Sequence, residues 1–166
     1  MTAGRVKSVT IVDADLSRTE HQDALVTMLD AYMLDPMEGG ERPPERIKRD
    51  LVPGLRAHPA CYVFLASRDG QPVGFSICFL GFSTFNARPL INIHDIFVDS
   101  SVRGMGIGAM LLGRIEAKAR ELNCCRITLE VREDNAVARG LYRKVGYDRV
   151  SVGPKRIPME FWHKLL

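Results

Sequence analysis

The chain has 166 residues, of which 46% are hydrophobic and 26% are charged. This size and composition are typical of one globular domain, here residues 1–166, and they exclude both a second full-sized domain and a disordered chain. The 23 basic and 20 acidic residues leave a net charge of only +3, which is too small for a dedicated nucleic-acid-binding surface. No segment approaches the roughly 18 consecutive apolar residues of a membrane helix, and the N-terminus lacks the apolar core of a signal peptide. We therefore expect a cytoplasmic protein with neither nucleic acid nor membrane as a partner.

The N-terminal third predicts one strand and two helices. Residues 8–12 form a short β-branched run, and Ser17 and Glu20 then have the spacing of a capping box that opens a helix reaching about Leu34. Residues 35–44 are rich in Pro, Gly and acidic residues, which indicates a loop. A second helix from Glu45 is expected to end near Leu51, because Pro53 follows.

Strand patterns dominate the centre of the chain. Residues 61–66 and 73–82 are β-branched and aromatic, and the Asp69-Gly70 pair between them predicts a hairpin. Residues 90–98 form a third strand, in which His94 and Asp95 interrupt an otherwise apolar run. The remaining expected elements are a glycine loop, a helix from about Ile107 to Leu122, a strand over 126–131, a helix over 135–145, and strands over 147–152 and 157–163. This order predicts an α+β fold.

The segment from Arg103 to Ala109 combines three glycines with the start of a helix. Glycines at a helix N-terminus leave backbone N–H groups exposed, and the helix dipole adds partial positive charge there. Arg103 adds a full positive charge. The segment therefore predicts a binding site for an anion, and a pyrophosphate matches so many donors.

Two other phosphate motifs fit this segment less well. A Walker loop is excluded because no Gly-Lys-Ser/Thr follows. The dinucleotide fingerprint matches literally at Gly104, Gly106 and Ala109, with Glu130 as the acidic residue further on. However, Asp99 to Arg103 separate the loop from its strand, Glu130 falls inside a strand, and the polar pair in residues 90–98 is atypical of a parallel sheet covered on both faces.

The phosphate-binding motif R-x-x-G-x-G/A matches at Arg103, Gly106 and Gly108. Another motif follows it further along the chain. This downstream motif is made of Leu129-Glu130-Val131, Asn135, Ala138, Leu141-Tyr142 and Gly146-Tyr147. With both motifs the chain resembles the GNAT superfamily of acetyl-CoA-dependent N-acetyltransferases. The resemblance covers about residues 73–147, and it implies a mixed, mostly antiparallel sheet of about seven strands flanked by about four helices.

The resemblance also implies where acetyl-CoA binds, as a co-substrate and without a metal ion. The strand over 90–98 and the strand over 126–131 are expected to splay apart, so that the backbone of the first can bond the pantetheine arm. The pyrophosphate is expected on the glycine loop, and Asn135 is similar to the family asparagine that bonds CoA. The cofactor-binding residues expected on this basis are Ile96, Phe97, Val98, Arg103, Gly104, Met105, Gly106, Ile107, Gly108, Ala109, Asn135 and Tyr142.

Three residues are candidates for proton transfer. Tyr142 matches the family tyrosine that lies near the CoA sulfur as a proton donor. His94 and Asp95 are candidate bases, although a structural role is equally compatible with either, and Glu130 is equally ambiguous. Adjacent residues on a strand point to opposite faces, so at most one of the pair is expected to face the substrate cleft.

These residues predict an acyltransferase that moves an acetyl group from acetyl-CoA to a primary amine of a small molecule or peptide by direct attack. The acceptor is expected to contact residues 35–53, residues 82–89 and the C-terminal strands. One alternative is a degenerate acyl-CoA-binding module with a regulatory or interaction role, and a more distant one is a dinucleotide-dependent oxidoreductase. A homodimer is common in the superfamily, although no residue pattern here requires one.

Overall fold

The computed structural model describes residues 8–152, 157–158 and 164. The chain divides into two compact units, residues 1–130 and residues 131–166, and each unit is described by itself. In the described part no helix is long and apolar enough to cross a membrane. The elements in chain order are β1 (Val9–Asp13), α1 (Thr19–Met33), the short 3-10 helix η1 (Pro36–Glu38), α2 (Glu45–Ala57), β2 (Cys61–Arg68), β3 (Gln71–Ser83), β4 (Arg88–Val98), the short 3-10 helix η2 (Ser100–Val102), α3 (Ile107–Glu121), β5 (Ile127–Leu129), α4 (Ala136–Lys144), β6 (Ser151–Val152) and β7 (Ile157–Pro158).

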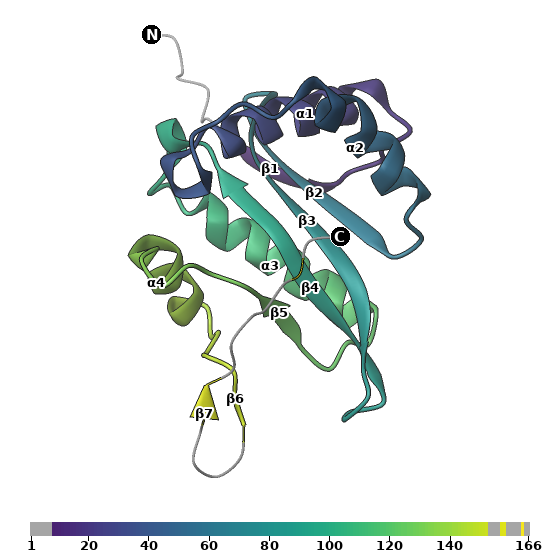
Figure 1. Cartoon of the computed structure of the whole chain (residues 1–166), viewed down its shortest axis with the longest axis vertical. Coiled ribbons are helices and arrows are strands. Elements are labelled where there is room, and N and C mark those ends of the chain that lie inside the picture. Colours follow the sequence, from purple (N-terminus) through teal and green to yellow (C-terminus); the bar gives the residue numbers. More distant parts are fainter. Residues whose placement is uncertain (1–7, 153–156, 159–163, 165–166) are drawn as a thin grey trace, which may run out of the picture. The chain divides into compact units, whose positions relative to one another are not determined.

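The first unit is built on a five-stranded sheet with the order β1-β2-β3-β4-β5 (Figure 1). The first four strands pair antiparallel, and β5 pairs parallel with β4. The mixed α+β architecture is thus as predicted, but the expectation of a sheet of about seven strands is wrong. The last two described strands, β6 and β7, are each two residues long and pair antiparallel with each other in a separate two-stranded sheet.

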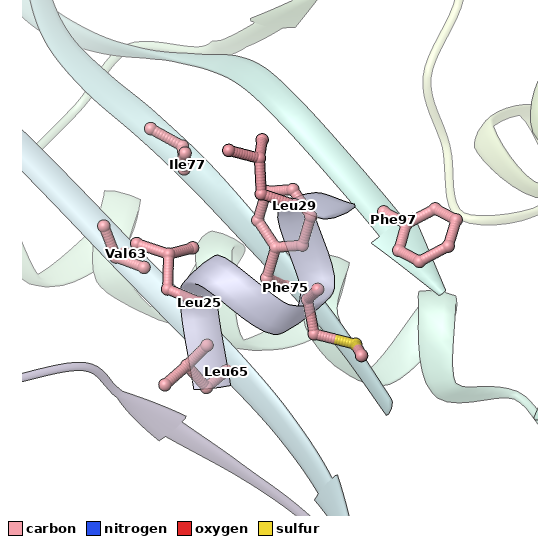
Figure 2. Close-up of a cluster of buried hydrophobic side chains, with 8 residues drawn as sticks. Leu25, Leu29, Val63, Leu65, Phe75, Ile77 and Phe97 are labelled. Carbon is pink, nitrogen blue, oxygen red and sulfur yellow. The ribbon is translucent and has the colours of Figure 1, made fainter. Parts of the chain in front are cut away.

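Helix α1 packs one face of this sheet, which we call the α1 face. Leu25, Met28 and Leu29 follow helical spacing and are buried against alternate strand residues (Figure 2). Those strand residues are Val63, Leu65, Phe75, Ile77 and Phe97. Because the side chains of a strand alternate, their neighbours along the chain point to the opposite face.

Helix α3 covers that opposite face, the α3 face. The predicted apolar stripe is confirmed for Ile107, Leu111 and Ile115, each at most 1% exposed, whereas Leu122 is half-buried. The guanidinium of Arg114 on α3 lies 5.8 Å from the ring centre of Phe64 on β2. Two helical layers therefore enclose the sheet and hold β4 between them.

The glycine-loop helix begins as predicted at Ile107, but several other ends differ. Helix α2 continues through Pro53 to Ala57, so the expected end near Leu51 is wrong, although Pro53 cannot donate a helical hydrogen bond. The capping box before α1 is wrong: Arg18 is the N-cap residue without a side-chain bond, because the Ser17 hydroxyl donates to Asp15 instead. Strand β5 is shorter than predicted.

The second unit contains α4 and the antiparallel pair β6 and β7. The Asn135 side chain accepts a hydrogen bond from the Ala138 N–H at 3.0 Å and so caps α4. At the other end the chain turns at Gly146, where φ is +95°. The predicted strand over 147–152 is reduced to Ser151–Val152, and residues 159–163 of the last predicted strand lie outside the described residues.

Candidate active site

A β-bulge in β4 sets the direction of the two polar residues in this strand. Ile93 lies opposite Cys78 on β3 and Asp95 lies opposite Ile77, so His94 is an extra residue without a partner on β3. Opposite residues in an antiparallel pair share a face, which places Asp95 with Ile77 on the α1 face. The His94 ring contacts Phe79, 5.6 Å away between ring centres, and Phe79 packs against the same α1-face cluster.

His94 and Asp95 therefore both lie on the α1 face. The expectation that these adjacent residues point to opposite faces is wrong, because the bulge interrupts the alternation of the strand at that point. The structure brings together two titratable groups that regular pleating would have separated.

Asp95 interacts with Tyr32 of α1. The carboxylates of Asp95 and of Glu38, which lies in η1, both act electrostatically on the Tyr32 hydroxyl. Burial raises the pKa of Asp95, while nearby His94 and the bond from Tyr32 act in the opposite direction. Burial, together with the two carboxylates, also raises the pKa of Tyr32 above its ordinary value. Asp95 is thus a partly buried carboxylate with increased proton affinity, next to the phenol of Tyr32.

His94 is exposed at the rim of this cluster. The Phe79 ring that supports it is flanked by a second histidine, His58, at 4.8 Å between ring centres. His58 lies at the C-terminal end of α2, and its Nδ1 accepts a hydrogen bond from the Ala60 N–H at 3.2 Å. His94 therefore lies next to an aromatic pair, Phe79 and His58.

The end of β4 has a strand neighbour on one side only. Pairing with β5 stops at Ile93 and Leu129, whereas β4 continues to Val98 beside β3. The segment from His94 to Val98 consequently presents a backbone edge that no described strand covers, as expected for splayed strands. Within this segment Phe97 is buried on the α1 face and Ile96 and Val98 are half-buried.

Where the two strands part, Glu130 follows β5. The Asn92 amide nitrogen lies 3.2 Å from the Thr128 hydroxyl and 3.5 Å from both carboxylate oxygens of Glu130. Glu130 is exposed, and these contacts hold its carboxylate next to β4.

The glycine loop follows directly after η2. Gly104 and Gly106 both have φ of +80°, a left-handed conformation that glycine adopts without steric cost. Gly106 is the N-cap residue of α3 and provides no side-chain cap, so the first N–H groups of the helix lack both a cap and a preceding carbonyl. Residues 103–106 are exposed. The glycine loop thus leads into a bare helix N-terminus, and its role as an anion site stays a prediction.

Arg103 at the start of this loop is already engaged by the protein. Its Nε donates to the Val98 carbonyl at 3.0 Å and its Nη2 bonds Asp35. Its guanidinium lies 5.7 Å from the centre of the Phe97 ring. Partial burial acts to raise the pKa of Asp35, but the bonds from the Met37 N–H and from Arg103 keep it below its ordinary value.

The remaining predicted site residues lie in the second unit. Asn135 caps α4, which is one of the two roles considered for it, and Tyr142 on α4 is 8% exposed. The Tyr142 ring is 5.9 Å from the ring of Tyr147. Within this unit Tyr142 therefore packs against Tyr147, and the proton-donor and CoA-binding roles of Tyr142 and Asn135 stay predictions.

Sequence reasoning missed Tyr32. Its place among the apolar residues of α1 gave it the pattern of a core residue, and its ring does pack 5.6 Å from Phe97 and 5.7 Å from Phe75. Only its hydroxyl reaches the polar cluster, and no motif marks that. The acidic content of residues 35–44 was the one available signal for Glu38.

Comparisons with known proteins identify the family. The model of the acetyltransferase (GNAT) family matches residues 25–147, which include β4, the glycine loop and α4. The chain belongs to the GNAT family. Among curated relatives of this GNAT protein, the N-alpha-acetyltransferase RimI of Mycobacterium tuberculosis (strain H37Rv) is 35% identical over 112 residues, covering 66% of this chain and 63% of the relative.

Solved structures agree with this assignment across nearly the whole GNAT chain. A crystal structure described as a probable acetyltransferase is 26% identical with a TM-score of 0.72, covering 95% of this chain and 96% of the other. An aminoglycoside N-acetyltransferase in complex with CoA has a TM-score of 0.76 at 16% identity, with 98% of both chains covered, which shows the shared fold. The chain spans between 18% and 64% of the length of the curated relatives that it matches.

Proposed function

We propose that the protein is an acetyltransferase that moves the acetyl group of acetyl-CoA to a primary amine by direct attack on the thioester. The observation that carries this proposal is the succession of an uncovered β4 edge and a bare helix N-terminus at the glycine loop. The first offers backbone groups to an extended arm and the second offers N–H groups to a pyrophosphate. CoA is bound in the structure of the aminoglycoside relative.

Within this proposal the residues divide by chemistry. The backbone of Arg103 to Ala109 holds the phosphates, and the edge from Ile96 to Val98 bonds the pantetheine arm. Acetyl-CoA supplies an activated acyl group. An N–H group of the same edge is suited to stabilise the oxyanion that forms when the amine attacks.

The amine must lose a proton before or during attack, since a primary amine with a pKa near 10.4 is deprotonated to about one part in a thousand at pH 7. Asp95 and His94 both face the α1 side of the uncovered edge, and the raised pKa of Asp95 makes it a stronger base than an ordinary aspartate. Tyr142 is proposed as the acid that protonates the departing CoA thiolate. A thiol relay is disfavoured, because partial burial and the neighbouring Cys125 raise the pKa of Cys124.

Acceptors of two kinds are suggested by the relatives: N-terminal amines of peptides and amino groups of aminoglycosides. We propose a primary amine without choosing between them. The predicted cytoplasmic location and homodimer belong to this proposal as well, and the second is checked by the mass of the purified protein in solution.

The test measures CoA thiol release from acetyl-CoA with a panel of peptide, aminoglycoside and polyamine acceptors. Tyr142→Phe is expected to lower kcat by about tenfold or more, with little change in CoA affinity, because only the proton donor is removed. Tyr62→Phe is the matched control, since the Tyr62 ring lies 6.0 Å from Lys118 on the α3 face.

Equal turnover of Tyr142→Phe and wild type would contradict the acid role. Tight acetyl-CoA binding without transfer to any acceptor would instead favour the degenerate acyl-CoA-binding module. Absence of CoA binding by the wild-type protein would contradict the proposed function itself.

A further inference from the structure

A second arginine lies against the glycine loop, far from it in sequence. Arg68 is the last residue of β2, and its Nη1 is 3.2 Å from the sulfur of Met105, the residue between the two left-handed glycines. The backbone position of Arg68 is fixed by pairing with Val9 on one side and Gln71 on the other. The side chain therefore reaches the loop from a rigid hairpin end.

Two N–H donors of the Arg68 guanidinium lack a strong hydrogen-bond acceptor. Its Nε is buried and has no hydrogen-bond partner, and its Nη1 donates to a thioether, which is a weak acceptor. Among the described residues Arg68 forms no ion pair, and its neighbour Asp69 is exposed. The guanidinium is a permanent positive charge, so the buried Nε stays a charged donor without an acceptor.

Arg103 gives the contrasting case. The arginine of the R-x-x-G-x-G/A motif already donates to Asp35 and to the Val98 carbonyl. Arg68, at the same loop, has a donor without an acceptor. An anion would bind both the bare N–H groups at the start of α3 and a guanidinium whose only acceptor among the described residues is a thioether. These two features arise from different parts of the chain and meet at Met105.

We propose that Arg68 binds a phosphate group of acetyl-CoA at the glycine loop. This inference rests on the proposed function, since it takes CoA as the ligand of the loop. CoA carries phosphate in two places, the pyrophosphate and the 3′-phosphate of its ribose, and both offer the paired oxygens that a guanidinium recognises. Arg68 thus adds to the cofactor site a side chain that the family motif does not contain.

The experiment measures the affinity of CoA and of dephospho-CoA, which lacks the 3′-phosphate, by titration calorimetry. Arg68→Gln is compared with wild type and with Arg56→Gln, which removes the same charge from an exposed position on α2. We expect Arg68→Gln to weaken CoA binding by about tenfold or more, as for a lost charge-assisted hydrogen bond, and Arg56→Gln to leave it near wild type.

The two ligands identify the phosphate. If Arg68 binds the 3′-phosphate, Arg68→Gln loses affinity for CoA but not for dephospho-CoA; if it binds the pyrophosphate, both ligands are weakened alike. Equal CoA affinity of the Arg68→Gln and Arg56→Gln proteins overturns the role of Arg68 while the proposed function stands. A wild-type protein that does not bind CoA contradicts the proposed function instead.

The melting temperature of the ligand-free variants checks that each is folded. Should Arg68→Gln not fold, Arg68→Lys carries the test, because lysine keeps the charge but loses the planar fork. It is expected to weaken CoA binding several-fold, and unchanged affinity overturns the proposal.

Discussion

Replacing Gly106 by alanine separates the conformational role of the loop from its binding role. Gly106 has φ of +80°, and an added Cβ would meet no other atom within 4 Å. The change therefore creates strain without a clash. An alanine in the left-handed conformation costs about 1–2 kcal/mol of folded-state stability. Alanine also lowers the conformational entropy of the unfolded chain, which stabilises the protein by about 0.4–1 kcal/mol. The free energy of unfolding should therefore fall by about 1 kcal/mol. For a chain of this length that lowers the melting temperature by about 2–4 °C.

Gly113→Ala is the matched control within the same helix. Gly113 is exposed inside α3, and its added Cβ also meets nothing within 4 Å, but its φ is not in the left-handed region. Alanine there should raise the free energy of unfolding by about 0.5–1 kcal/mol. The two variants thus change stability in opposite directions through the same chemical substitution.

The two variants should differ more in their affinity for CoA than in their stability. The methyl group that Gly106→Ala introduces would stand in the open space of the loop, and relaxation of φ would turn the adjoining N–H groups. We expect calorimetry to show CoA affinity about tenfold to a hundredfold lower for Gly106→Ala and unchanged for Gly113→Ala. A Gly106→Ala protein that is destabilised as calculated but binds CoA like wild type would refute the placement of the phosphates on this loop.

Further substitutions test the candidate base and the fold. Because the folded protein holds the pKa of Asp95 above its ordinary value of 3.8, the folded state binds the proton more tightly and ionisation costs stability as pH rises above about 4. The difference in unfolding free energy between Asp95→Asn and wild type should therefore shift in favour of Asn between pH 4 and pH 8 in urea titrations, and a constant difference would argue against the raised pKa. Leu25→Ala should cost about 2–5 kcal/mol because Leu25 is fully buried, whereas Phe85→Ala should stay within about 0.5 kcal/mol because Phe85 is 96% exposed. Gly74→Ala should destabilise the protein as well, since its Cβ would lie 2.6 Å from the Phe97 carbonyl oxygen; a melting temperature at or above that of wild type would show that the end of β4 moves freely.

The parts of the fold that were predictable are those specified by local sequence. The Asp69-Gly70 turn has positive φ at both residues, 52° and 80°, as a two-residue hairpin loop requires. The stripe of Ile107, Leu111 and Ile115 identified both α3 and its buried face. In each case neighbouring residues carry the whole signal.

The features that were missed depend on distant residues. Pro53 lies inside α2 without ending it, and β6 and β7 form a sheet of their own because their pairing partners are each other. The cluster at Asp95 depends on Tyr32, a residue far earlier in the chain that looks apolar in its helix. Such contacts arise only in the folded chain. No residue pattern in the sequence marks the bulge at His94.

Because of that bulge, the number of residues in β4 decides which face of the sheet the residues after it point to. Because one extra residue stands between Ile93 and Asp95, every residue from Asp95 to Val98 is out of phase with the first half of the strand. Exchanging His94 or Asp95 for another polar residue would leave this phase intact. Deleting one residue would invert it, driving the carboxylate of Asp95 toward α3 and withdrawing Phe97 from the α1 core. The number of residues between Ile93 and Phe97 is therefore fixed by the core on both sides of the sheet.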